Sequence, residues 1–449
     1  MKLERNNKIV QADRPRMTDF EAYVRVLESH AVAALEGQKV CVDRQRLSRF
    51  LNGETGAELR RCVPLADRQS IGAFFTGESL RSRAIGPRLN GRVSGTIWDP
   101  ACGAGDLLLG YGEKLPIYPD IGQTLIDWGK RIGGNDTEEI FLRAAKARLV
   151  LAAYSRGARK IATTKLKLSL DEVFPLLQCE NSLEASLGFE PTEIVLNPPF
   201  VSIKAPERCE WGSGNISAAA QFVDSCLKVA KSGSRIIAIL PDVLRAGSRY
   251  GHWRKYIQEF AAIERVDVYG SFDPQADVDV FILELKVREA RLTSTGSEEP
   301  WGVRHKPSSK KLADYCTVAV GAVVPHRDKE IGLEYAYLHS RDAPPWERIN
   351  SLSSRRKFAG TTFQPPFVVI RRTSSPSDKF RALGTLVNCS EPVAVENHLL
   401  ICKPHDGTVK TCKAILETLK SPATNEWLNS RIRCRHLTVG AVRDIPWET

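Results

Sequence analysis

Four consecutive residues, Asn197-Pro198-Pro199-Phe200, are the strongest candidates for chemistry in this chain. They follow the short apolar run Glu193–Leu196, which is typical of a buried strand in a parallel sheet. Two successive prolines cannot continue that strand, because each lacks a backbone N–H and holds φ at about −65°. We therefore expect a rigid turn at the carboxyl end of a strand, where ligands bind in open α/β sheets. Its amide, carbonyls and ring could bind a planar amine; a strand-ending turn with a core phenylalanine is the alternative.

A second motif, Asp99–Asp106, places two acids beside a glycine-rich turn. Ile97-Trp98 predicts a strand that enters the turn Asp99-Pro100-Ala101-Cys102-Gly103-Ala104-Gly105-Asp106. Gly103 and Gly105 would let the backbone approach a ligand without a Cβ in the way. The spacing of a phosphate-binding GxGxxG loop is absent, and carboxylates would repel a phosphate. The acids instead favour a cationic ligand, and S-adenosylmethionine carries both an ammonium and a sulfonium. A purely structural strand–turn–helix is the alternative.

Two further stretches could complete a ligand site. Asp136 follows a glycine pair and precedes a helical pattern, so it could bind ribose hydroxyls at the end of a second strand or cap the helix. Ile71–Gly77 contains Phe74, Phe75 and Thr76 between glycines. This composition suits a loop that closes over a small ligand, and equally a buried loop anchor.

The elements around these motifs alternate between strand and helix, which predicts a doubly wound, mostly parallel sheet. The expected helices are 138–153, 219–231 and 251–262, the closing strands are 263–269 and 278–286, and 201–218 is expected to be a polar loop. Composition predicts a helical amino-terminal region at 1–65, the α/β domain at 66–290, a polar linker at 291–311 and an α+β domain at 312–449. In the last of these, Thr317–Val324, Phe367–Ile370 and Val393–Cys402 predict strands, and Arg371-Arg372 opens an exposed basic loop.

The net charge of +11 is concentrated in the last third of the chain. Residues 301–449 hold 23 lysines and arginines against 14 aspartates and glutamates. A basic terminal domain suits a polyanionic partner, nucleic acid first, while a merely solvated surface gives the same count.

Composition also bears on compartment and metals. No apolar run approaches the ~20 residues of a membrane span, and the first residues lack a signal-peptide core. The eleven cysteines include no CxxC pair, and Cys402, His405 and Cys412 lack a fourth ligand at usable spacing. We expect a cytoplasmic protein with reduced thiols, no membrane association and no metal site.

Taken in their order along the chain, the motifs resemble those of the gamma-class N6-adenine DNA methyltransferases of restriction–modification systems. Gly72–Gly77 resembles their cofactor loop, Asp99–Asp106 their DPxCGSGxF motif, and Asn197–Phe200 their NPPY or NPPF motif. Asp136 resembles the ribose acid, and Glu180–Leu183 the loop that holds the cofactor adenine. The resemblance covers residues 65–290 and extends loosely through the carboxyl-terminal region.

The resemblance implies a class I S-adenosylmethionine-dependent methyltransferase with a Rossmann-like α/β fold and an α+β target-recognition domain. It implies cofactor contacts from Phe75, Thr76, Asp99, Pro100, Ala101, Gly103, Gly105, Asp106, Asp136, Asn181, Ser182 and Asn197. The catalytic set is Asn197, Pro198, Pro199 and Phe200, and the basic pair Arg371-Arg372 is the candidate for contact with double-stranded DNA. The resemblance is compatible with a separate endonuclease or specificity subunit as a partner, in restriction–modification or phage defence.

The mechanism that follows acts on the exocyclic amine of adenine. The Asn197 side-chain oxygen and the Pro198 carbonyl would accept its two N–H hydrogens and localise the nitrogen lone pair. The nitrogen then attacks the sulfonium methyl in line, without a covalent enzyme intermediate. The base must leave the stack, and Phe200 would stack on it. A carbon-5 cytosine mechanism needs a cysteine after a proline, and the chain has no Pro-Cys pair.

Three positions depart from the pattern of this class. Gly77 stands where proline is usual, Ala104 where serine is usual, and Asn181 replaces the acid that contacts the adenine. Asparagine can still donate to a ring nitrogen, so we expect cofactor binding to survive, weakened at most. The departures keep a second class open, a non-catalytic DNA-binding or specificity subunit with a degenerate fold. RNA adenine and protein glutamine methyltransferases share the tetrapeptide, but the basic last third and a cofactor loop upstream of the glycine turn favour DNA.

Overall fold

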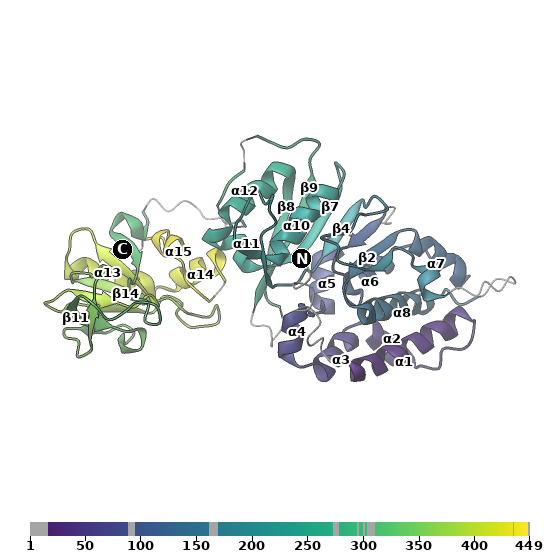
Figure 1. Ribbon diagram of the computed structural model, residues 1–449, viewed down its shortest axis with the longest axis horizontal. Helices are drawn as coiled ribbons and strands as arrows, with labels where there is room; N and C mark the ends of the chain where they lie inside the picture. Colours follow the sequence, from purple (N-terminus) through teal and green to yellow (C-terminus); the bar gives the residue numbers. More distant parts are fainter. Residues whose placement is uncertain are drawn as a thin grey trace, which may run out of the picture. The chain divides into compact units, whose positions relative to one another are not determined.

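The computed structural model describes residues 17–88, 95–160, 169–272, 278–293, 296–299, 301–302, 310–433 and 435–447. The chain forms two compact units (Figure 1), one from 1–241 with 255–297 and the other from 242–254 with 298–449. Residues 1–16 of the predicted amino-terminal region lie outside the described residues. So do 294–295, 300 and 303–309 of the predicted linker.

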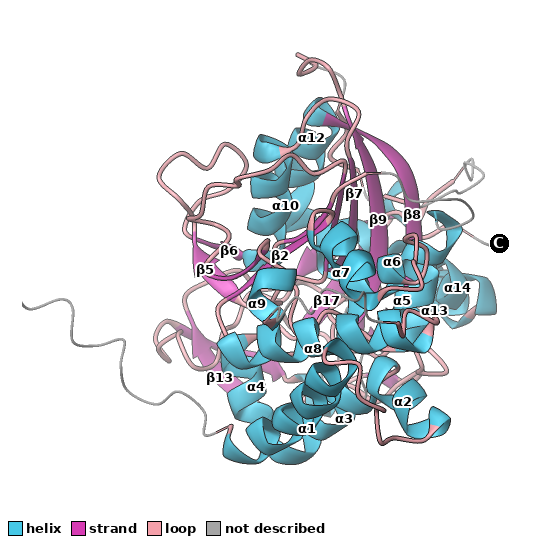
Figure 2. Ribbon diagram, turned by 90° about the vertical axis from the view of Figure 1, so that its right-hand side faces the viewer, coloured by secondary structure: helices cyan, strands magenta, loops and turns pink. Residues whose placement is uncertain are grey.

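The first unit is built on a seven-stranded sheet with the order β3-β2-β1-β4-β7-β9-β8. Its strands β7, β9 and β8 lie side by side in Figure 2. Its strands are β1 (Ile97–Asp99), β2 (Ile132–Asp136), β3 (Leu177–Cys179), β4 (Glu193–Leu196), β7 (Arg235–Pro241), β8 (Ala261–Ser271) and β9 (Asp279–Val287). The pairs among β1, β2, β3, β4 and β7 are parallel, and β9 runs antiparallel to both of its neighbours. The predicted doubly wound, mostly parallel sheet is confirmed.

Helices cover both faces of this sheet (Figure 2), which is why its central strands read as continuous apolar runs. Ile194, Val195 and Leu196 of β4 have no exposed surface. The covering helices are α6 (Asp106–Gly112), α7 (Ile121–Gly129), α8 (Glu139–Ser155), α9 (Leu170–Val173), α10 (Ala218–Val229) and α12 (Gly251–Phe260).

The order of the strands reverses at β1, which lies between β2 and β4. Strands β1, β2 and β3 follow one another toward one edge, and β4 and β7 lie on the other side. Trp98 of β1 pairs with Ile194 of β4, so the carboxyl ends of these two parallel strands adjoin. Such a reversal opens a crevice beyond the carboxyl ends. Asp99 and Asn197 therefore arrive at the same edge of the sheet.

In the described residues before β1, five α-helices share one hydrophobic core with the sheet. They are α1 (Thr18–Leu35), α2 (Arg44–Leu51), α3 (Glu54–Cys62), α4 (Leu65–Ile71) and α5 (Glu78–Ile85). Helix α1 lies along α8 (Figure 1). The centroids of the Phe20 and Phe141 rings lie 5.9 Å apart in an edge-to-face arrangement. The amino-terminal helices are thus packed on the helix that follows β2.

The second unit is mixed α+β. It contains a five-stranded sheet, β10-β17-β14-β15-β12, and a three-stranded sheet, β13-β11-β16. The strands are β10 (Cys316–Val320), β11 (Leu333–Leu338), β12 (Arg348–Ile349), β13 (Arg355–Phe358), β14 (Phe367–Arg371), β15 (Gly384–Val387), β16 (Val393–Val395) and β17 (Leu399–Pro404). The helices are α11 (Asp242–Ala246), α13 (Val409–Lys420), α14 (Pro422–Arg431) and α15 (Val439–Arg443).

Two local predictions are wrong. The single strand expected at 393–402 is divided into β16 and β17, which belong to different sheets. Between them, the Leu399 N–H donates to the Glu396 carbonyl at 3.0 Å, and this tight turn separates the two strands. The loop expected at 201–218 contains a small antiparallel pair, β5 (Ser202–Lys204) and β6 (Asn215–Ser217). Its pairing rests on Ile203 opposite Ile216, two apolar residues among polar ones.

The described ranges contain neither a membrane-spanning helix nor a metal-binding cluster. No helix there has both the length and the apolar character needed to cross a membrane. The same ranges contain no group of three or more histidine, cysteine or acidic side chains arranged to hold a metal ion.

Candidate active site

One cavity lies at the carboxyl ends of β1, β2 and β4 and holds about 1010 Å³ of empty space open to solvent. The predicted residues that line it are Phe75, Thr76, Asp99, Pro100, Ala101, Gly103, Asp106, Asp136, Asn181, Ser182, Asn197 and Pro199. Motifs separated by more than a hundred positions in the chain therefore surround one space, as the strand order requires.

Three predicted residues are not among those that line the cavity. Pro198 is buried. The centroids of the Phe200 and Phe272 rings lie 5.5 Å apart in an edge-to-face arrangement. Gly105 faces α8, where an added Cβ would lie 3.0 Å from the Cβ of Ala145. Gly105 thus lets the turn pack closely on α8.

The glycine turn is fixed by backbone hydrogen bonds to the end of β2. The Gly103 N–H donates to the Asp136 carboxylate at 2.9 Å, and the Cys102 N–H donates to the Asn135 carbonyl at 2.9 Å. Gly103 has a φ of +51°, and an added Cβ would lie 3.1 Å from the Phe75 ring. The turn therefore needs glycine here both for its conformation and for the space beside Phe75.

Asp99 and Asp136 give the cavity its acidic character. Burial raises the pKa of Asp99 well above its ordinary value, against a single backbone hydrogen bond from Ala101 at 3.1 Å. Burial also raises the pKa of Asp136, to about 6, although Gly103 and Glu138 donate backbone N–H groups to it. Within the described part of the chain, no ion pair involves either carboxylate. Two carboxylates that are costly to ionise would gain from a bound cation or from hydroxyl donors.

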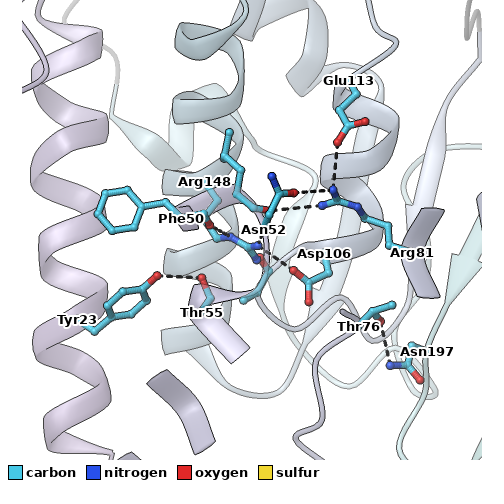
Figure 3. Close-up of polar contacts among 12 residues, drawn as sticks. Tyr23, Phe50, Asn52, Thr55, Thr76, Arg81, Asp106, Glu113, Arg148 and Asn197 are labelled. Atoms are coloured by element: carbon cyan, nitrogen blue, oxygen red, sulfur yellow. Dashed lines mark hydrogen bonds and ion pairs between the residues drawn. The ribbon is translucent and has the colours of Figure 1, made fainter. Parts of the chain in front are cut away.

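Asp106 lines the same cavity, but its charge is already compensated. The guanidinium of Arg148 on α8, which has no exposed side-chain surface, lies 2.8 Å from the Asp106 carboxylate (Figure 3). Asp99 and Asp106, the two acids predicted to bind a cationic ligand, are therefore not equivalent in the structure. Asp99 remains unpaired by a cation among the described residues, while Asp106 is tied into the protein.

The loop after β3 presents Asn181 and Ser182 to the cavity. The Asn181 amide donates to Glu184 at 2.7 Å and accepts the Leu183 backbone N–H at 3.2 Å, so its contacts are local. The Ser182 hydroxyl donates to the Pro100 carbonyl at 2.7 Å. This bond links the loop directly to the glycine turn.

Asn197 extends from the end of β4 toward the loop 72–77. Its amide nitrogen donates to the Thr76 hydroxyl at 3.0 Å (Figure 3). It also donates to the Phe74 carbonyl at 3.3 Å. A carbonyl oxygen can only accept a hydrogen bond, so the nitrogen, not the oxygen, must face the loop. The Asn197 side-chain oxygen is thereby oriented away from the loop as an acceptor.

Gly72 brings that loop onto the tetrapeptide. Its φ is +67°, and an added Cβ would lie 2.3 Å from the Cβ of Pro199. We expect Gly72→Ala to destabilise the protein by about 2–4 kcal/mol, since left-handed strain and overpacking add. Denaturant unfolding measures this loss. Gly53→Ala is the matched control, because Gly53 has a φ of +85° and open space around it. An equal loss in both variants would contradict the role of the Pro199 contact.

No protein-family model matches the chain, and no curated protein matches it either. Solved structures do. The type IIL restriction–modification enzyme MmeI in complex with DNA matches at 13% identity with a TM-score of 0.55, over 87% of this chain and 70% of that one. The type I restriction enzyme EcoKI M protein matches at 14% identity and a TM-score of 0.37, over 63% of this chain and 65% of that one. A protein from Listeria monocytogenes is provisionally described as a class I S-adenosylmethionine-dependent methyltransferase. It matches at 14% identity with a TM-score of 0.39, over 62% of this chain and 91% of that one.

The likeness to MmeI and the strand order together decide the fold. The chain shares with MmeI an open, doubly wound α/β fold. In this fold, the cavity occupies the crevice at the reversal of strand order, where ligands bind in open α/β sheets.

Several residues lining this crevice lie outside the predicted motifs. They are Leu107, Thr137, Phe141, Val201, Ile203, Ala218 and Phe222. Glu180 and Leu183 belong to the predicted adenine loop, and the Glu180 carboxylate accepts a hydrogen bond from Asn135 at 2.8 Å. Proximity to Asp136 could have identified Thr137. Phe141 and Phe222 carry only the signal of core residues on amphipathic helices.

Arg371 and Arg372 belong to the second unit. Arg371 is the last residue of β14, and its guanidinium donates to the Ala343 carbonyl at 2.9 Å. Both side chains are half-buried. The expectation of an exposed basic loop is therefore wrong for this pair. Arg371 still belongs to β14, which is paired on both sides, and the Arg372 backbone N–H donates to the His398 carbonyl at 3.0 Å. Contact with DNA through these arginines stays a prediction.

Proposed function

We propose that this chain transfers a methyl group from S-adenosylmethionine to the N6 amine of adenine in duplex DNA, in restriction–modification or phage defence. The observation that carries the proposal is the orientation of Asn197, whose nitrogen is held by Thr76 and Phe74 and whose oxygen is left as an acceptor. An adenine amine needs such an acceptor, because its lone pair is otherwise delocalised into the ring.

The residues around the cavity fit S-adenosylmethionine. Asp99 would hold the ammonium, Asp136 the ribose hydroxyls, and the loop at Asn181 and Ser182 the adenine. Gly103 leaves space where a Cβ would meet the Phe75 ring at 3.1 Å. When bound, the cofactor supplies an activated methyl group on a positively charged sulfur.

The chain's own contribution to the reaction is positioning and preorganised dipoles. The Asn197 oxygen and the Pro198 carbonyl would accept the two N–H groups of the amine and localise its lone pair. Thr76 and the Phe74 carbonyl fix the amide, so it need not reorient during the reaction. Phe200 would stack on the base, once the base has left the duplex.

A nucleic acid is favoured over protein as the substrate because the last third of the chain is basic. MmeI, whose structure was solved with DNA, is similar over 87% of this chain. We propose that residues 312–449 contact DNA and that the protein acts in the cytoplasm, alone or with an endonuclease or specificity subunit.

Radiolabelled cofactor offered with duplex DNA, RNA or a protein mixture tests the substrate class. Label in duplex DNA alone supports the proposal, and label in RNA or protein alone overturns it. Calorimetry with S-adenosylmethionine tests the second class, a non-catalytic DNA-binding subunit: absence of binding would favour that subunit.

Thr76→Val should lower kcat about three- to tenfold, because the variant keeps the shape of threonine but cannot accept the Asn197 hydrogen bond, which is worth about 1 kcal/mol. Steady-state kinetics on a DNA substrate measures the change. Thr76→Ser keeps the hydroxyl and should remain close to the parental kcat. Equal kcat values for valine and threonine would show that the hydroxyl does not orient Asn197.

Cofactor affinity should depend on pH through Asp136. The folded pKa of this acid lies at about 6, above its ordinary 3.8. The stability it contributes to the unliganded protein is present below 3.8 and lost as the pH rises through 6. Binding needs the ionised form, so affinity should fall as the pH drops below 6, by at most about tenfold per unit for one proton. Calorimetry between pH 4.5 and 7 measures it, and Asp136→Asn should show weak binding without the step near pH 6. A flat profile in the parent would rule out Asp136 as the ribose acid.

A further inference from the structure

Arg148 joins the glycine turn to a helix almost a hundred positions earlier in the chain. It lies on α8, with no exposed side-chain surface. On the turn, its guanidinium donates to the Ala104 carbonyl at 2.5 Å and pairs with Asp106 at 2.8 Å (Figure 3). Both acceptors belong to the turn that lines the cavity.

The same guanidinium also holds the end of α2. It donates to the carbonyls of Phe50 at 2.8 Å and Leu51 at 3.2 Å. The last carbonyls of a helix have no partner within the helix and carry partial negative charge, so a cation there satisfies them. Four acceptors in two separate segments thus share one side chain.

Only arginine can make this set of contacts. Its planar guanidinium presents five N–H donors in a fixed fork, whereas lysine presents one compact ammonium. A lysine at position 148 could pair with Asp106 or bind α2, but it could not span both. Arg148→Lys would therefore keep the positive charge but lose the link between the glycine turn and the end of α2.

Arg81 on α5 provides a natural comparison. It donates to the Leu51 carbonyl at 3.3 Å, to the Asn52 side chain at 2.8 Å and to Glu113 at 3.1 Å (Figure 3). It therefore supports the same end of α2 as Arg148. None of these three contacts reaches the glycine turn.

The amino-terminal helices approach the cavity at a second place as well. An added Cβ at Gly56 of α3 would lie 3.6 Å from the Cβ of Phe75, so the α3 backbone packs on a residue that lines the cavity. The Tyr23 and Thr55 hydroxyls are 3.1 Å apart, which ties α1 to α3 (Figure 3). The helices α1, α2 and α3 are thus linked to each other and to the site.

We propose that Arg148 is a positioning residue that couples α1–α3 to the glycine turn, so that these helices form a structural part of the cofactor site. The ligand part of this inference rests on the proposed function. The coupling itself is a property of the unliganded protein, and it can be measured without any cofactor.

Hydrogen exchange of the unliganded protein tests the coupling. In Arg148→Lys, amides of both segments, 49–53 and 103–109, should exchange at least about tenfold faster, because local opening no longer breaks a shared set of bonds. In Arg81→Lys, only 49–53 should change. Unchanged exchange at 103–109 in Arg148→Lys, or equal changes there in both variants, would overturn the coupling.

Calorimetry with S-adenosylhomocysteine tests the consequence for the site. Arg148→Lys should bind about tenfold more weakly than the parent, and Arg81→Lys within about twofold of it, because only the first variant releases the turn. Equal affinity of the two variants would overturn the positioning role. Failure of the parent to bind would overturn the proposed function, while the exchange comparison would still decide the coupling.

If Arg148→Lys does not fold, the parent supplies the test. Residues 49–53 do not line the cavity. Binding of S-adenosylhomocysteine should nevertheless slow exchange of their amides, because the ligand fixes the turn to which Arg148 ties them. No change in 49–53 on ligand binding would overturn the inference.

Discussion

Replacing Asn197 by alanine should lower the rate of methyl transfer at least about a thousandfold, the upper range seen when a preorganised polar group is removed from an active site. The substitution removes the oxygen that would accept the adenine amine. It leaves Asp99, Asp136 and the adenine loop in place, so affinity for S-adenosylmethionine should change only about threefold, through release of Thr76. Single-turnover transfer to duplex DNA gives the rate, and calorimetry gives the affinity.

Asn181→Ala is the matched control. It also removes an amide at the cavity, but one whose contacts are confined to Glu184 and Leu183. This variant should raise the KM for the cofactor and leave kcat nearly unchanged, the opposite pattern to Asn197→Ala. Near-parental transfer by Asn197→Ala would contradict its catalytic role.

Replacing Asp99 by asparagine should weaken cofactor binding about ten- to a hundredfold, the usual loss when a hydrogen bond to a charged group is removed. The amide oxygen can still accept the Ala101 N–H, so the turn is preserved. The amide cannot, however, compensate the ammonium of the ligand. Calorimetry with S-adenosylmethionine measures the loss.

The same substitution should stabilise the unliganded protein. The folded pKa of Asp99 lies well above its ordinary value of 3.8. The stability that this acid contributes is therefore present below 3.8 and is lost as the pH rises through the folded value. The Tm of Asp99→Asn should exceed the parental Tm at pH 8, and the difference should shrink toward pH 4. A lower Tm at pH 8, or unchanged affinity, would show that Asp99 is structural.

The parts of the site that could be predicted are those with local causes. Two prolines after a buried run end β4 at Asn197 whatever the rest of the chain does. A strand that enters glycines with positive φ forms a turn for the same kind of reason. The strand order that brings these motifs together follows from alternating strands and helices, which favour one doubly wound arrangement.

The parts that could not be predicted depend on distant partners. Arg148 lies among apolar residues of α8, and its acceptors are backbone carbonyls, which every residue possesses. Nothing in the sequence therefore distinguishes it from a solvated arginine, or shows that Asp106 is paired. The half-burial of Arg371 depends likewise on Ala343, in another segment. The β5–β6 pair was missed because one isoleucine in each short strand leaves no alternation to detect.

The central claim is methylation of adenine N6 in duplex DNA by a reaction that needs Asn197. The most direct measurement is nucleoside mass spectrometry of unmethylated plasmid DNA after incubation with purified protein and S-adenosylmethionine, in parallel with Asn197→Ala. We predict N6-methyladenine in the DNA treated with the parent protein and none above background with the variant. Bound cofactor without N6-methyladenine, or equal N6-methyladenine from both proteins, would contradict it.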